Sequence, residues 1–174
     1  MSAATTSKTR PEPVQLGGLG VNFLLDGDDT DGRFSLVEHP IAPRALAAPV
    51  HTHLDEDEYS YVLEGLVGVE IGDETIVAGP GQLVRKPRGV PHAFWNAGDE
   101  PARVLEIISP AGFERFFTEA AVLMESPEPD EAAWGDLLAR FRLDMDFSTV
   151  ERLAIAHQLV VDPVDDQLAS PAKR

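Results

Sequence analysis

Residues 49–65 read PVHTHLDEDEYSYVLEG, and this stretch decides how the chain is interpreted. It places two of the chain's five histidines, His51 and His53, one residue apart, ahead of an acidic run that ends at Glu58. A solvated loop would account for the acids but not for the histidines. On a β-strand alternate side chains share a face, so an H-x-H pair directs both imidazoles at one point. The stretch therefore predicts a strand that carries part of a polar site.

A further histidine, His92, follows in GQLVRKPRGVPHAFWN. Three neutral imidazole nitrogens and one carboxylate oxygen suit a divalent transition metal such as Fe, Mn, Ni, Co, Cu or Zn. Four protein ligands leave two positions open on an octahedral ion, where a substrate or O₂ binds. We therefore expect one metal ion held by His51, His53, Glu58 and His92.

The composition limits the partners of the protein. The 174 residues carry a net charge of −16, which repels nucleic-acid phosphates and anionic lipid headgroups. The absence of cysteine excludes disulfides, thiolate metal sites and cysteine nucleophiles. No apolar run near the N-terminus reads as a signal sequence, and none approaches the length of a membrane helix. The expectation is a soluble cytoplasmic protein with a small-molecule substrate, no nucleic acid and no membrane.

Four segments differ in character along the chain. Residues 1–13 are small, polar and bounded by proline, which indicates a mobile leader. Residues 14–109 consist of short β-rich runs separated by Gly, Pro and Asp, which predict an all-β sandwich or barrel. Residues 110–161 form a helical extension packed on the barrel, and residues 162–174 are expected to fray. Within the β region, EIGDETIV predicts two strands around a Gly-Asp turn.

The extension is predicted to hold two or three short helices. In SPAGFERFFTEAAVLM, Ser109 is a candidate N-cap, Pro110 fits the first helical position, and the phenylalanines follow helical spacing. DEAAWGDLLARF indicates a second helix. STVERLAIAHQL indicates a third, in which Ser148 and Glu151 have the spacing of a capping box.

The site residues and the glycines around them resemble both motifs of the cupin superfamily. The first motif, H-x-H-x4-E-x6-G, is matched by His51, His53, Glu58 and Gly65. This spacing selects Glu58 rather than Asp57. The second motif, G-x5-P-x-G-x2-H-x3-N, is matched by Gly81, Pro87, Gly89, His92 and Asn96. One position departs, because Ala45 stands where the first motif has a turn glycine.

The resemblance implies a fold and a range of activities. The fold is a double-stranded β-helix, a jelly-roll barrel with the metal inside, and cupins commonly form homodimers through outer sheet faces. The extent of the barrel and the helical tail are similar to small cupins of the quercetin-dioxygenase-like group. That group implies a metal-dependent, dioxygenase-like oxidoreductase acting on a small enolic or aromatic molecule, with Glu58 as ligand and catalytic base.

Two other functions fit the same residues. The first is a non-redox isomerase, epimerase or lyase, in which the ion only polarises a carbonyl or hydroxyl group. The second is a small-molecule-binding cupin without turnover, because a fold does not fix a function. An anionic substrate would give the basic cluster Arg85, Lys86 and Arg88 a purpose, although charge balance on an exterior turn is the preferred interpretation.

The remaining chemistry-bearing side chains are assigned structural roles. His39 and His157 are interpreted as structural or surface residues, and Asn96 as a brace for a turn. The acids before Glu58 are interpreted as a solvated turn, and Tyr59 and Tyr61 as packing or interface residues. Phe113, Phe116 and Phe117 are expected at the seam between helix and barrel. Phe94 shares strand parity with His92 and is the preferred pocket residue.

Overall fold

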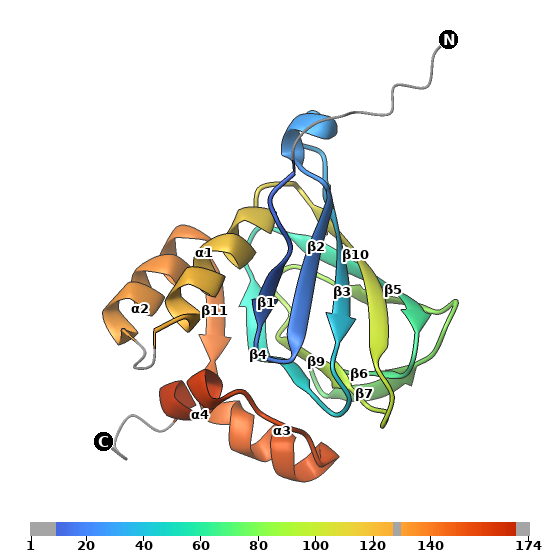
Figure 1. The fold of residues 1–174 in the computed structure, drawn as a ribbon. Helices are drawn as coiled ribbons and strands as arrows, with labels where there is room; N and C mark the ends of the chain where they lie inside the picture. The colour runs from blue at the N-terminus through green and yellow to red at the C-terminus, as the bar shows by residue number, and fades with distance from the viewer. Residues whose placement is uncertain (1–9, 127–129, 170–174) are drawn as a thin grey trace.

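The protein folds into two antiparallel β-sheets that face each other, with helices packed beside and below them (Figure 1). The computed structural model describes residues 10–126 and 130–169. One sheet has six strands in the order β1-β2-β3-β10-β5-β8, and the other has five in the order β11-β4-β9-β6-β7. The predicted mainly β, jelly-roll fold with short C-terminal helices is confirmed. Most of the predicted leader, residues 1–9, lies outside the described residues.

The strands are short, as the spacing of turn residues predicts. Their bounds are β1 (Val14–Leu16), β2 (Leu19–Leu25), β3 (Ser35–Ile41), β4 (Leu46–His53), β5 (Asp57–Glu64), β6 (Val67–Ile71), β7 (Glu74–Ala78), β8 (Leu83–Lys86), β9 (His92–Asn96), β10 (Ala102–Ser109) and β11 (Leu143–Asp146). The predicted hairpin around Gly72 and Asp73 joins β6 to β7, with Ile71 opposite Glu74.

Alternation of buried and exposed residues defines the interior of the sandwich. Every second residue of β3 and of β10 is buried, and the two strands pair with Val104 opposite His39. Most of these inward residues are apolar, but Ser35 and His39 on β3 and Glu106 on β10 are not. The barrel interior is therefore an apolar core that contains a small number of polar side chains.

The turn that precedes β4 forms without the motif glycine. Ala45 is buried, and its N–H donates to the Ala42 carbonyl over 3.1 Å. The left-handed conformation falls one residue earlier, on Arg44 (φ 56°), whose guanidinium pairs with Asp99 at 2.7 Å. The strand that carries His51 and His53 thus begins in the expected place.

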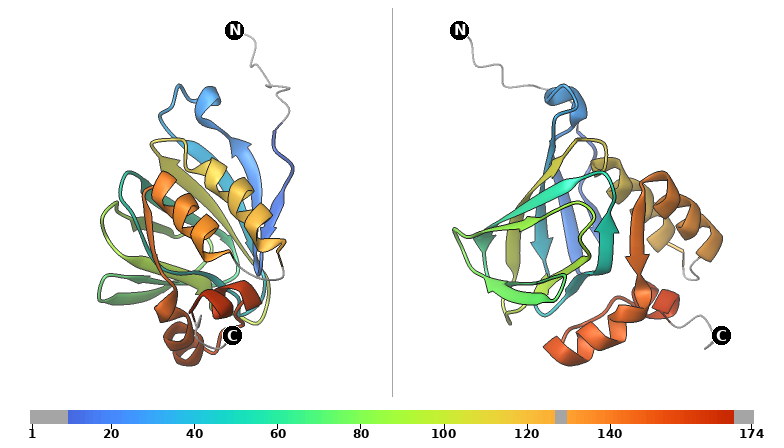
Figure 2. Two further views of the ribbon diagram at one scale, coloured as in Figure 1. Left: turned by 90° about the vertical axis from the view of Figure 1, so that its left-hand side faces the viewer. Right: turned by 180° about the vertical axis from the view of Figure 1, so that it is seen from behind.

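The helices differ in detail from the prediction. They are α1 (Glu114–Met124), α2 (Glu131–Arg140), α3 (Val150–His157) and α4 (Pro163–Ala169), together with 3₁₀ turns η1 (Gly27–Asp29) and η2 (Phe147–Thr149). Figure 2 shows α1 and α2 side by side against one flank of the sandwich and α3 and α4 below it. The tail predicted to fray from residue 162 includes α4, and residues 170–174 lie outside the described residues.

Two predicted helix caps are wrong. Ser109 is the last residue of β10, where its hydroxyl donates to the Arg33 carbonyl, so α1 begins later, after Phe113. Ser148 lies in η2, whose cap is Asp146, and no side chain caps α3. Both serines have the spacing of helix N-caps. In the structure, however, Ser109 belongs to a strand and Ser148 to a 3₁₀ turn. None of the helices in the described ranges has the length and apolar composition needed to cross a membrane.

Strand β11 was not predicted, and it lies beside the histidine strand. Leu143 pairs with His53 and Met145 with His51, so β11 forms the edge of the five-stranded sheet next to β4. Its sequence, LDMD, is too short to stand out within a region of helical character. The C-terminal extension therefore contributes a strand as well as helices to the wall of the barrel.

Gly68 allows a close approach that the sandwich requires. It lies opposite Trp95 in the pairing of β6 with β9, and a Cβ placed on it would be 2.1 Å from the indole Nε1. The indole is 2% exposed and packs on α3 through Leu153. Because Gly68 has no side chain, the indole ring of Trp95 fits against β6.

We predict that Gly68→Ala lowers the free energy of unfolding by about 1–3 kcal/mol, because the tryptophan must leave its rotamer or the strands must separate. Urea unfolding followed by tryptophan fluorescence measures the change. Gly135→Ala is the matched control, because Gly135 lies on α2 with nothing within 4 Å of an added Cβ. Equal stability of the two variants would contradict the close approach.

Candidate metal centre

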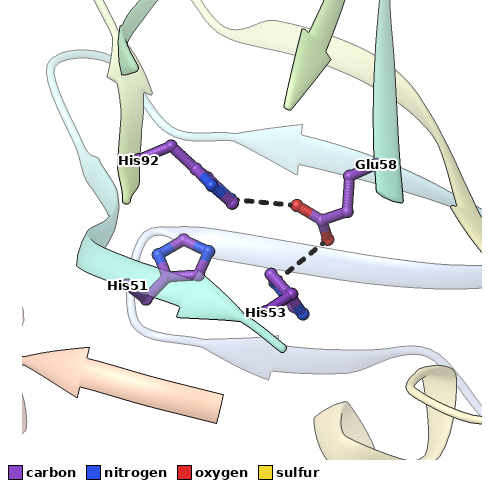
Figure 3. Close-up of side chains that lie close together, drawn as sticks. All are labelled: His51, His53, Glu58 and His92. Carbon is purple, nitrogen blue, oxygen red and sulfur yellow. Dashed lines mark hydrogen bonds and ion pairs between the residues drawn. The ribbon is translucent and has the colours of Figure 1, made fainter. Parts of the chain in front are cut away.

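Four buried side chains from three strands converge inside the barrel. His51 and His53 come from the end of β4, Glu58 from β5 and His92 from β9. One ligand atom from each lies within 4.8 Å of all the others, and Figure 3 shows the four groups pointing toward one another. The structure thus brings together the full set predicted from the sequence, in a geometry that could hold a metal ion.

Strand pairing and sheet packing explain why these residues meet. His51 lies directly opposite His92 in the pairing of β4 with β9, and His53 follows two residues later on the same face. Glu58 belongs to the other sheet and faces them across the interior. The cluster therefore joins the two sheets at one end of the sandwich.

Backbone acceptors orient two of the three imidazoles. The Nδ1 atom of His51 lies 2.8 Å from the Pro49 carbonyl, and that of His92 lies 3.0 Å from the Val90 carbonyl. A carbonyl only accepts, so Nδ1 carries the proton in both rings and Nε2 keeps its lone pair. Nδ1 of His53 faces the Glu56 carboxylate at 3.6 Å instead. Acceptors of this kind behind metal-binding histidines fix the tautomer.

The arrangement of the ligand atoms suits a bound cation. Nε2 of His92 lies 3.2 Å from Oε2 of Glu58, and Nε2 of His53 lies 3.4 Å from Oε1 of the same carboxylate. When Nδ1 of His92 holds the proton, its Nε2 presents a lone pair to a carboxylate oxygen. Two acceptors facing each other repel unless a cation lies among them, which a divalent metal provides.

Burial keeps the imidazoles of His51 and His92 neutral, as ligation requires. Desolvation, reinforced by the neighbouring imidazoles of His92 and His53, holds the pKa of His51 well below its usual range. Desolvation also lowers the pKa of His92, with Lys86 acting in the same direction. For Glu58, desolvation opposes ionisation, but His53 and the Lys86 ammonium group outweigh it and hold the pKa of Glu58 well below normal. His51 and His92 therefore offer neutral nitrogens, and Glu58 offers an ionised carboxylate.

Lys86 is part of the site, which corrects the interpretation of the basic cluster as exterior. Its Nζ is buried and lies 2.9 Å from Oε2 of Glu58 and 3.1 Å from Oε2 of Glu106. Ser60 donates to the same Glu106 oxygen over 2.7 Å. Glu106 and Glu58 raise the pKa of Lys86 against the effect of burial, while burial raises the pKa of Glu106 to about 7. A buried lysine is thus held between two carboxyl groups.

The two arginines of that cluster behave as predicted for charge balance. Arg88 pairs with Asp57 at 2.8 Å, and Arg85 lies 3.8 Å from the same carboxylate, both on the outer surface. Strand parity separates Arg85 from Lys86, because exposed and buried residues alternate along β8, and Arg88 lies in the turn after that strand. The acids before Glu58 are not simply solvated, since Asp57 is paired with Arg88, Asp55 is paired with Arg142, and Glu56 is buried beside His53.

A cavity of about 80 Å³ opens beside the cluster. Its polar wall includes His51, His53, Glu58, Lys86 and Glu106. The rest of the wall is largely apolar and aromatic, with residues from the barrel, α1, α2 and β11: Leu16, Leu19, Ala47, Ala48, Phe94, Phe113, Phe116, Phe117, Ala120, Met124, Trp134, Leu143, Met145 and Phe147. The three phenylalanines expected at the helix seam line this cavity as well, and Phe94 lines it as predicted.

Sequence reasoning missed two further residues of the site region. His39 is buried and lines the cavity, although it was assigned a structural or surface role. The Glu56 carboxylate lies 3.6 Å from Nδ1 of His53, the ring nitrogen that does not face Glu58. The alternation of buried residues on β3 would have placed His39 inside once the strand was aligned, but no motif singles it out.

Other structural roles agree with the prediction. Asn96 braces the turn after β9, because its Nδ2 donates to the carbonyls of Ile41 and Glu100 and its Oδ1 accepts from Gly98. His157 stacks on Trp95 with ring centroids 4.1 Å apart, away from the cavity. Tyr61 is exposed on the outer face of β5. None of these residues belongs to the cluster.

Residues 38–108 match the cupin domain family. The matched segment contains all four residues of the cluster, together with Lys86 and Glu106. No curated protein sequence matches the chain. The family match does not separate the quercetin-dioxygenase-like group from other cupins.

Solved structures show the same fold. KdgF from Halomonas sp. superposes with a TM-score of 0.54 at 18% identity, covering 60% of this chain and 91% of that one. A predicted oxalate decarboxylase from Thermotoga maritima gives a TM-score of 0.53 at 17% identity, covering 63% and 99%. An oxalate decarboxylase variant from B. subtilis gives 0.51 at 23% identity, covering 59% of this chain but 28% of that one. At these identities the likeness concerns the fold alone.

We predict that Glu58→Gln weakens binding of a divalent ion such as Mn²⁺ or Co²⁺ more than about tenfold, because the cluster loses its only anionic ligand. Competition with a chelating dye measures the dissociation constant. Asp57→Asn is the matched control, since this neighbouring acid pairs with Arg88 outside the barrel. Equal losses in the two variants would contradict the selection of Glu58.

We also predict that Lys86→Met destabilises the protein by about 3–5 kcal/mol, because it leaves the buried Glu58 and Glu106 without their cation. Chemical unfolding without added metal measures this loss. Lys86→Met combined with Glu106→Gln should recover part of it. Arg85→Met, on the exposed side of the same strand, should cost less than about 1 kcal/mol. A Lys86 variant as stable as the Arg85 variant would disprove the buried network.

Proposed function

We propose that the protein is a metal-dependent, dioxygenase-like oxidoreductase that acts on a small enolic or aromatic molecule. The observation that supports this most is that His51, His53 and Glu58 of the cluster line the polar wall of a cavity whose other walls are largely apolar and aromatic. Such a cavity suits a planar, largely apolar molecule with oxygen atoms at one end. It is a poor environment for a sugar or a small dicarboxylate, whose polar groups would face phenyl rings.

The aromatic wall begins directly at the cluster. The ring of Phe113, directly before α1, lies edge-on to His53 with centroids 4.3 Å apart, and Phe116 and Phe117 follow on the first turn of the helix. These rings restrict water beside the polar wall and provide flat surfaces for a ring to pack on. The residues of α1 thus support binding of an aromatic or enolic ring next to the metal ligands.

The charges near the cavity disfavour an anionic substrate. Arg85 and Arg88 pair with Asp57 on the outer surface and do not line the cavity. Lys86 does line it, but Glu58 and Glu106 already neutralise the ammonium group. The argument for an isomerase of anionic sugars or acids, which depended on this basic cluster, therefore loses its main support.

The cluster would hold one divalent ion, with His51, His53, His92 and Glu58 as ligands. The ion would supply a Lewis acid for an enolate or catecholate oxygen and, for a redox-active metal, electron exchange with O₂. Glu58 is ionised and can accept a proton from the hydroxyl group of the substrate. Its low pKa makes it a weak base, which suffices for a hydroxyl that a metal ion has acidified.

Two expectations accompany this proposal. The homodimer predicted from the cupin resemblance stays a prediction; Tyr61 and Leu83, which face each other across β5 and β8, are 39% and 59% exposed on an outer sheet face. The cytoplasmic location also stays a prediction. The native metal is one of Fe, Mn, Ni, Co, Cu and Zn, which this ligand set accommodates.

We load the protein in turn with each of these ions and predict oxygen uptake with a redox-active ion when catechol-type or hydroxypyranone substrates are added. An oxygen electrode and mass spectrometry of the products measure the reaction. With a redox-active ion the rate should exceed that of the free ion, and in His53→Ala it should fall to the free-ion rate. His157→Ala, which changes a histidine outside the cavity, should retain full activity.

Different results would replace the proposal. Conversion under Zn²⁺ in the absence of oxygen would establish the non-redox isomerase, epimerase or lyase. Tight binding without any product, with every metal and in air, would establish a binding module without turnover. Failure to bind any metal would exclude both metal-dependent enzymes and favour the binding module without turnover.

A further inference from the structure

His39 is a buried histidine that the proposed chemistry does not use. It lies on β3, in the sheet opposite His51 and His53, and it is 2% exposed. It is not a member of the four-residue cluster, but its side chain lines the same cavity as His51 and His53. The cavity is thus lined by a further histidine, His39, that is not one of the candidate metal ligands.

The hydrogen bond of His39 fixes its tautomer. Nδ1 lies 3.0 Å from the Gly20 carbonyl on β2, which can only accept, so Nδ1 carries the proton. Nε2 is then an acceptor with a free lone pair, and no donor from residues 10–126 or 130–169 reaches it. Burial lowers the pKa of His39 to about 4, so the ring stays neutral near pH 7.

Aromatic rings connect His39 to the metal ligands. The His39 ring is edge-on to Phe117 at 5.2 Å, Phe117 is 5.5 Å from Phe113, and Phe113 is 4.3 Å from His53. On the other side Phe94 lies 6.3 Å from His39, with the Lys86 ammonium 4.7 Å from the Phe94 centroid. A ring bound among these side chains would have the metal cluster at one end and His39 at another.

Nε2 of His39 has no hydrogen-bond donor within the described residues and lines the cavity, so a ligand that supplies a donor gains a hydrogen bond there. We propose that His39 Nε2 accepts a hydrogen bond from a hydroxyl or N–H group of the bound molecule. The inference rests on the proposed function and narrows its substrate class. The substrates that we expect are enolic or aromatic rings with one pair of metal-binding oxygens and a separate hydrogen-bond donor.

The test compares ligands that differ only by that donor. The probes are two pairs of catechols, 4-(hydroxymethyl)catechol against 4-methylcatechol and 4-(2-hydroxyethyl)catechol against 4-ethylcatechol. Their binding to the Zn²⁺-loaded protein without oxygen is measured by calorimetry, so no turnover is involved. In at least one pair the hydroxylated member should bind about fivefold more tightly, as one net hydrogen bond provides.

Two variants separate recognition from a structural role. The amide of His39→Asn can still donate to the Gly20 carbonyl but has no atom in place of Nε2, so the preference should disappear. His39→Gln carries an amide oxygen near the position of Nε2 and should keep it. His157→Asn is the control, because His157 stacks on Trp95 outside the cavity and should leave the preference unchanged.

The outcomes distinguish this inference from the function on which it rests. A preference that persists in His39→Asn, or equal binding within both pairs in the wild type, would overturn the role of His39 alone. Catechols that bind to no form of the protein would overturn the proposed substrate class and the inference together. A preference that is lost in His39→Asn and kept in His39→Gln would establish the hydrogen bond.

Discussion

The ionised carboxylate of Glu58, buried between two sheets, is the constraint on which the rest of the site depends. A charge inside an apolar barrel is unfavourable unless other groups compensate it. Here Lys86 lies 2.9 Å away from one oxygen, and two imidazoles face the carboxylate from the opposite sheet. Glu106 and Ser60 in turn hold the lysine. The polar interior is therefore one connected network rather than four independent ligands.

The same network explains why one end of the interior is polar and the remainder is not. Lys86 is fully engaged by carboxyl groups, so it offers little attraction to an anion, while phenyl rings of α1 cover the space beyond it. The C-terminal extension completes that wall, with β11 beside β4 and residues of α1 and α2 lining the cavity. The segment that the sequence predicts only as a helical cover of the barrel thus shapes the space in which a substrate would bind.

The prediction from sequence succeeded where local pattern and tertiary structure agree. Alternating runs bounded by turn residues indicated the strands, and the Gly-Asp hairpin and α2 formed where expected. It failed where one residue had two possible uses. Ser109 and Ser148 have the spacing of helix caps, but one belongs to β10 and the other to a 3₁₀ turn. β11 was missed because four residues are too few to show a period.

The sequence by itself determined the jelly-roll fold and the set of residues that meet at the candidate metal centre, because His51, His53, Glu58 and His92 lie at motif spacings on predicted strands. Only the tertiary structure decided the positions of Lys86 and His39. Both are polar residues on short strands, and their sequence neighbours do not tell which face of the strand is buried. That face is set by pairing with strands distant in sequence, and by burial against the opposite sheet, which a charge pattern along the chain does not encode.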